Sequence, residues 1–196
     1  MTTSNSTIEK MNHILKHHDE YVKKLETTFN LANEPFNDRM SAGILLVQSE
    51  LGMRTGELCN LSKDCLHYDG QGTPHIEIKR AVSDSPYHKS ISIDCSPELE
   101  IRVKALLKLR EQCPAAETSP YLYVLDKKGK GSEKKPVNPE FLNAKFRKFC
   151  GDDARVNMLR LYRVLKLRTT GLPAKEIQKC LGHWVGHSSI VSYVSL

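Results

Sequence analysis

The feature that most constrains the fold is a change in the period of the apolar residues along the chain. From Ile8 to Phe29 they recur on one face at helical spacing, and a second helical segment is expected from about Asp38 to Leu51. Apolar and polar residues then alternate in His75–Lys79 and in Lys89–Ile93, a pattern typical of two strands of a hairpin. Helical spacing returns after Pro97. The sequence therefore predicts a mixed α/β fold, mainly α-helical, with a small antiparallel sheet.

Turn-forming residues separate these segments. Ser6 and Glu9 have the spacing of a capping box at the start of the first helix, and the stretch from Asn33 to Pro35 interrupts the helical pattern. The second helix is expected to end near Gly52, and a third to begin at Thr55.

The composition is that of an ordinary globular chain. With 196 residues, 39% of them apolar, it can bury a core, and we expect an N-terminal amphipathic helix or arm (residues 1–35) and one domain (residues 36–196). The six cysteines form no Cys-x-x-Cys pair, which favours reduced thiols and a cytoplasmic location. The polar N-terminus and the short apolar stretches argue against secretion and membrane insertion.

The charge balance favours a polyanionic partner. The formal net charge is +6 and the isoelectric point is about 9.0. Part of this charge comes from a lysine-rich stretch between Asp126 and Pro136, which has no apolar face and is interpreted as a solvated loop rather than a specific DNA clamp.

Two segments about a hundred residues apart carry polar residues at fixed spacing. In the first, Gly52-Met53-Arg54-Thr55-Gly56-Glu57-Leu58, a glycine turn places an arginine at a helix start with a glutamate three positions on. In the second, Gly171 follows Arg160 by eleven residues, His183 of Leu181-Gly182-His183 follows Gly171 by twelve, and Tyr193 follows His183 by ten.

Together these boxes resemble the catalytic domain of the tyrosine recombinases, the integrase family of phages and mobile elements. The resemblance covers roughly residues 36–196. It departs from the family pattern at two places: Asn157 stands where a histidine is usual, and Tyr193 lies one residue further from His183 than usual. The resemblance implies the recombinase catalytic fold, with a three-stranded sheet, and cleavage of DNA with neither a cofactor nor a metal ion.

The chemistry of the family assigns roles to these residues. Tyr193 would attack phosphorus and form a 3′-phosphotyrosyl link, which conserves the energy of the phosphodiester. Arg54 and Arg160 would neutralise the charge on the nonbridging oxygens. His183 would donate a hydrogen bond to the phosphate. Glu57 would orient the catalytic residues without contacting the phosphate itself.

Proton transfer involves two further positions. The family protonates the leaving 5′-oxygen with a lysine of the hairpin; Lys79 fits this role better than Lys89, which is expected to contact DNA. Asn157 occupies the position of a general base for a tyrosine whose free pKa is about 10, and an amide cannot accept that proton. The site is therefore either slow and dependent on the arginines and water, or inactive.

Several residues have a simpler interpretation beside the functional one. Arg163 and Lys166 are expected on a solvated or DNA-facing helix surface. Cys180, His183 and His187 have no fourth partner at metal-ligand spacing, so core packing of Cys180 is favoured over a metal site. Trp184, nine residues before Tyr193, is a second candidate for the place of His183.

Other classes of protein remain possible from the sequence. The segment from Leu172 to Gly182 resembles the first helix and turn of a helix-turn-helix module, which would bind DNA without chemistry. A type IB topoisomerase uses similar residues, and Asn157 leaves room for a degenerate recombinase that only regulates.

The expected partner is double-stranded DNA, with no small-molecule substrate and no membrane. About fifty residues precede Arg54 and three follow Tyr193, so we expect this chain to lack the usual N-terminal DNA-clamp domain and to be a fragment or catalytic domain. A tetramer on DNA is expected for the full-length protein, whereas this chain alone is expected to be monomeric.

Overall fold

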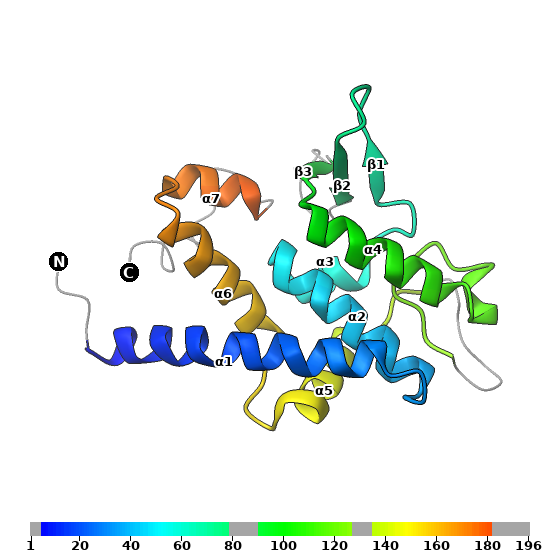
Figure 1. The fold of residues 1–196 in the computed structure, drawn as a ribbon, viewed down its shortest axis with the longest axis horizontal. Helices are drawn as coiled ribbons and strands as arrows, with labels where there is room; N and C mark the ends of the chain where they lie inside the picture. The colour runs from blue at the N-terminus through cyan, green and yellow to red at the C-terminus, as the bar shows by residue number, and fades with distance from the viewer. Residues whose placement is uncertain (1–4, 79–89, 127–134, 182–196) are drawn as a thin grey trace.

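The computed structural model describes residues 5–78, 90–126 and 135–181 (Figure 1). In these ranges the order of elements is α1 (Asn5–Asn30), α2 (Phe36–Leu51), α3 (Thr55–Cys59), β1 (Leu66–Tyr68), β2 (Pro74–Ile78), β3 (Ile91–Asp94), α4 (Pro97–Arg110), a 3₁₀ turn (Pro114–Ala116), α5 (Pro139–Cys150), α6 (Val156–Thr169) and α7 (Ala174–Cys180). The predicted fold class, mainly helical with a small antiparallel sheet, is confirmed.

Helix α2 is the centre of the core. It contacts α1, α4, α5 and α6, and its residues from Met40 to Ser49 are all buried. At Gly43 the neighbours come closest, because a Cβ there would lie 2.7 Å from Leu106 of α4 and 2.7 Å from Phe29 of α1. A side chain at this position would force the side chains of Leu106 and Phe29 to shift.

Helix α2 begins two residues earlier than the sequence predicts. The sequence predicts a start at about Asp38, but Pro35 takes the N-cap position, and its carbonyl accepts hydrogen bonds from the N–H groups of Asp38 (2.9 Å) and Arg39 (3.1 Å). The end of the helix at Gly52 and the start of α3 at Thr55 are both confirmed.

The sheet is a three-stranded antiparallel meander in the order β1-β2-β3. The predicted pairing of the two longer strands is confirmed, with Ile78 opposite Ile91 and Ile76 opposite Ile93. Strand β1 is only three residues long, too short for alternation to locate it. Residues 79–89, between β2 and β3, lie outside the described residues.

The C-terminal part of α1 packs on the rest of the molecule. Tyr21 and Leu25 belong to the main core cluster, and the ring of His18 stacks on Tyr162 of α6, with 3.2 Å between ring centroids. Burial lowers the pKa of His18, against the opposing effect of its hydrogen bond with Asp19. The helix thus shares one core with the residues after it, and the division at residue 35 stays a prediction.

A buried carboxylate ties α5 to α2. Asp38 is 2% exposed, and its two oxygens accept hydrogen bonds from Lys145 (2.5 Å) and Lys148 (2.6 Å). Burial by itself would raise the pKa of Asp38, but the two lysines outweigh it and hold the pKa below its usual value. Since the folded pKa is the lower one, the contribution to stability is present above about pH 4 and is lost as the pH falls through the folded pKa.

The buried ion pair predicts that replacing the two lysines costs more stability than replacing Asp38. Replacing both Lys145 and Lys148 with methionine leaves the buried carboxylate without its two lysine partners. It should lower the free energy of unfolding at pH 7 by about 3–5 kcal/mol. Asp38→Asn should cost less, because the lysines can then extend into solvent, where Lys148 already has 59% of its side chain. Urea unfolding measures both, and an equal or greater loss in Asp38→Asn would contradict this account.

Candidate active site

The turn between α2 and α3 presents Arg54. Gly52 ends α2 in the left-handed conformation (φ 64°, ψ 30°), which favours glycine, and its N–H donates to Gln48 O at 2.8 Å. Arg54 follows in an extended conformation (φ −68°, ψ 144°) at the N-cap of α3. The chain therefore leaves α2 and enters α3 within three residues, and the Arg54 side chain is 51% exposed.

Glu57 holds Arg54 from two directions. One carboxylate oxygen accepts the backbone N–H of Arg54 at 3.1 Å, and the other accepts Nη1 of its guanidinium at 3.2 Å. Glu57 thus accepts a backbone N–H at the N-terminus of α3, where its negative charge in the first turn is favoured. The structure thus brings together the two residues that the sequence paired, and Glu57 leaves part of the Arg54 fork accessible.

Arg160 reaches the same turn from α6. Its Nη1 donates to Gly52 O at 2.6 Å, across 108 residues of sequence, and the side chain is half-buried. Arg54 and Arg160 therefore lie on segments joined by a direct hydrogen bond. Asn157, one turn earlier on α6, is exposed.

The first residue of the Leu-Gly-His box, Leu181, also packs against this turn. Leu181 is 3% exposed and packs with Val164, Leu167 and Ile177 between α6 and α7. A Cβ on Gly52 would lie 2.9 Å from Leu181 Cδ2. Three separated parts of the sequence, the turn after α2, helix α6 and the end of α7, thus meet around Gly52.

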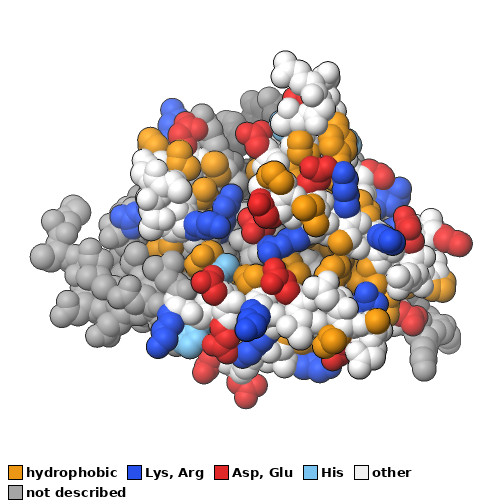
Figure 2. Space-filling model, viewed as in Figure 1, with side chains coloured by type: hydrophobic (Ala, Val, Ile, Leu, Met, Phe, Trp, Pro, Cys, Tyr) orange, Lys and Arg blue, Asp and Glu red, His pale blue; other side chains and the backbone are white. Residues whose placement is uncertain are grey.

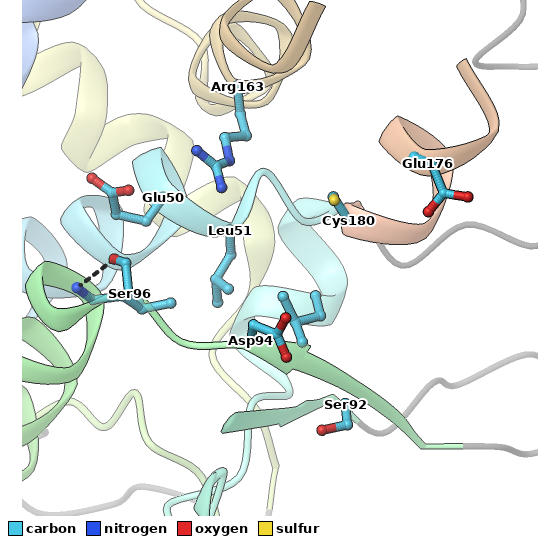
Figure 3. A pocket seen from close by; sticks show the side chains of 10 residues that line it. Glu50, Leu51, Ser92, Asp94, Ser96, Arg163, Glu176 and Cys180 are labelled. Carbon is cyan, nitrogen blue, oxygen red and sulfur yellow. Dashed lines mark hydrogen bonds between the residues drawn. The ribbon is translucent and has the colours of Figure 1, made fainter. Parts of the chain in front are cut away.

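Beside the turn lies a pocket of about 350 Å³ whose walls come from α2, β3, α6 and α7 (Figure 3). Arg163 extends into it from α6, and Asp94 and Glu176 lie on its rim. The stem of Arg163 also packs on the turn, since its Cβ and Cγ would be 3.0 Å from a Cβ on Gly52. Arg163 is therefore half-buried in a pocket that Glu50, Asp94 and Glu176 also line, and its contact with DNA stays a prediction.

The remaining predicted residues are distributed as follows. Lys166 is exposed on α6, on the side near His18, whose pKa its charge helps to lower. Four lie outside the described residues: Lys79, Lys89, His183 and Tyr193. Their roles stay predictions, although Lys79 directly follows the buried Ile78 of β2.

Sequence reasoning missed Gln48. Its side chain is fully buried in α2, where Nε2 donates to Met53 O at 2.6 Å and Oε1 accepts the N–H of Met53 at 3.1 Å. The available signal was a single amide directly after the apolar run Ile44-Leu45-Leu46-Val47. A buried amide needs partners, and the nearest backbone without helical hydrogen bonds is the following turn.

The charged side chains on the surface are of mixed sign. The face in Figure 2 carries basic and acidic side chains interspersed over α1 and α4, not a single basic stripe. Among the described residues, no group of three His, Cys, Asp or Glu side chains could hold a metal ion. None of the described helices has the length and apolar character needed to cross a membrane.

Comparison with known proteins identifies the family. The sequence model of the phage integrase family matches residues 10–195, so the chain belongs to this family. No curated protein matches the sequence significantly.

Solved structures share the fold. The recombinase XerH in a post-cleavage complex with its difH substrate has a TM-score of 0.64 at 18% identity, over 90% of this chain and 48% of XerH. XerA recombinase gives 0.59 at 21% identity, over 91% and 57%. The lambda integrase catalytic core gives 0.53 at 16% identity, over 86% and 91%. This chain thus spans about half of XerH and nearly all of that catalytic core.

The packing around Gly52 predicts a specific cost for a side chain there. Gly52→Ala should lower the free energy of unfolding by about 2–4 kcal/mol, from the left-handed backbone and from contact with Leu181 and Arg163. Gly72→Ala is the matched control, because Gly72 also has positive φ (82°) but nothing lies within 4 Å of its Cβ position. It should cost only about 1–2 kcal/mol. Equal losses in urea unfolding would contradict the packing described here.

Proposed function

We propose that this chain is the catalytic domain of a site-specific DNA recombinase, which breaks and rejoins DNA through a 3′-phosphotyrosine intermediate without a metal ion. One observation carries the proposal: the hydrogen bond from Arg160 to Gly52 O, which joins the helix of Arg160 to the turn that presents Arg54. Two guanidinium groups on joined segments provide the positive charge that phosphoryl transfer requires.

Each proposed residue acts at a defined step of DNA cleavage and rejoining. The Tyr193 oxygen attacks phosphorus and loses its proton, the bond to the 5′-oxygen breaks, and Lys79 gives that oxygen a proton. Arg54, Arg160 and His183 stabilise the charge on the nonbridging oxygens. A 5′-hydroxyl of a partner strand then attacks the phosphotyrosine, returning its proton to Lys79, and the released Tyr193 oxygen takes a proton from water.

Asn157 affects the first step. In the position where the family has a histidine, its amide accepts no proton, so the Tyr193 proton passes to water. We therefore propose an active but slow enzyme, in preference to a degenerate one, because the contacts that hold Arg54 and Arg160 are all in place.

The proposed partner is duplex DNA, bound through phosphate contacts that include Lys89, Lys166 and Arg163, so affinity should fall steeply with salt. A structure of lambda integrase is described as a tetramer bound to a Holliday junction. We propose by analogy a DNA-associated protein in the cytoplasm, whose full-length form assembles as a tetramer on its site.

The helix-turn-helix interpretation is less favoured. Helix α7 is short, and its Ile177 and the following Leu181 are buried against α6 beside the Gly52 turn. The segment therefore helps to build the site of the arginines. A regulator of this kind would form no covalent link to DNA, and a topoisomerase would relax supercoils without exchanging strands.

Covalent trapping tests the nucleophile. The substrate is a pool of duplexes with randomised flanks around one 5′-bridging phosphorothiolate, whose thiolate leaving group neither needs a proton nor religates. The parent chain should form a detergent-resistant adduct, and Tyr193→Phe should form none while retaining the same amount of DNA on a filter, because only one oxygen is lost. An adduct in the variant would show that another residue is the nucleophile. Absence of any parental adduct would favour a non-catalytic DNA-binding protein.

The acid can be tested with the sequence selected from that pool. On the all-oxygen duplex, Lys79→Ala should slow cleavage by about 100-fold or more, and Lys89→Ala much less. On the phosphorothiolate duplex, Lys79→Ala should cleave close to the parental rate. If sulfur does not restore the rate, the proton comes from another group.

A further inference from the structure

Two consecutive peptide groups connect Gly52 to Arg54, and both polar ends of each are hydrogen-bonded. In the first, Gly52 O accepts from Arg160 and the N–H of Met53 donates to Gln48 Oε1. In the second, Met53 O accepts from Gln48 Nε2. The remaining polar end of the second peptide group is the N–H of Arg54.

The N–H of Arg54 donates to Glu57. The chain of contacts therefore runs from Arg160 through one peptide group to Gln48, and from Gln48 through the next to Glu57 and Arg54. Gln48 is the side chain that takes part in both peptide groups. Rotation of either group would break one of its two bonds.

We propose that Gln48 is a positioning residue for DNA cleavage, whose amide sets the orientation of Arg54 relative to Arg160. The proposal rests on the proposed function of the two arginines. Gln48 and Met53 are 0% and 1% exposed, so water cannot readily replace the amide. The direction of the Arg54 side chain follows from the peptide plane before it, and Gln48 fixes that plane.

If the buried amide of Gln48 only filled space, replacing it with a side chain of similar volume would leave the cleavage rate unchanged. Methionine has nearly the volume of glutamine and would fill the same site without donating or accepting these hydrogen bonds. If Gln48 acts by position, Gln48→Met should reduce the cleavage rate by roughly 10- to 100-fold with little change in DNA affinity, because misplacement of about 1 Å affects the reacting geometry most.

The first measurement is independent of activity. Amide hydrogen exchange at Met53 should become at least about tenfold faster in Gln48→Met, because the buried bond from its N–H to Gln48 is lost. Exchange at Arg54, whose N–H bonds to Glu57, should rise with it because its peptide group is released. In Gln48→Glu, whose neutral carboxyl keeps one donor and one acceptor, the exchange rates should lie between those of Gln48→Met and those of the parent. Ser41→Ala is the matched control, since Ser41 is also fully buried in α2 and bonds to Tyr123 instead. It should leave exchange at the turn unchanged.

The second measurement is a double-mutant cycle on the trapped duplex. Gln48→Met should slow cleavage strongly in the parent but by less than about threefold in an Arg54→Ala background, because the residue through which it acts is gone. Ser41→Ala should have little effect in either background.

The outcomes separate the two proposals. Equal effects of Gln48→Met in both backgrounds, or unchanged exchange at Met53 and Arg54, would overturn the positioning role. A parent chain that traps no DNA would refute the proposed function, and the exchange measurement would still decide whether Gln48 holds the turn. If Gln48→Met does not fold, Gln48→Leu, which also lacks both the donor and the acceptor, carries both measurements.

Discussion

The hydrogen bond from Arg160 to the carbonyl of Gly52 is the contact on which the site depends. It joins α6 to the end of α2 across 108 residues of sequence. Gly52 permits it in two ways: its positive φ turns the chain at this point, and its missing side chain leaves room for Leu181 and the stem of Arg163. Any larger residue would place a Cβ within about 3.0 Å of Leu181 and of the stem of Arg163, so both would have to shift.

The fold was largely predictable because its determinants are local. Apolar spacing locates the long helices, and Gly52 marks the end of α2 with its own conformational preference. The exceptions have physical causes. Pro35 starts α2 early because its carbonyl, not the side chain of Asp38, receives the first hydrogen bonds. The three residues of β1 are ordered by pairing with β2, which no local pattern encodes.

The candidate site was predictable in its residue types but not in its support. Spacing paired Arg54 with Glu57, whose contact is local, and it related Arg160 to the later boxes. It could not show that Arg160 binds a backbone carbonyl, that Arg163 faces a pocket with Asp94 and Glu176, or that Gln48 holds the turn. These contacts depend on tertiary packing of α2 against α6. Under the proposed function the core would take part in catalysis, since its central helix carries the amide that bonds to the turn before Arg54.

The most direct test is a crystal structure of the Tyr193→Phe variant bound to the duplex that the parent traps. We expect the guanidinium groups of Arg54 and Arg160 to contact the same phosphate, the ring at position 193 to face it, and the bond from Arg160 to Gly52 O to persist. Contacts of the two arginines with separate phosphates, or a ring at position 193 directed away from DNA, would contradict this expectation.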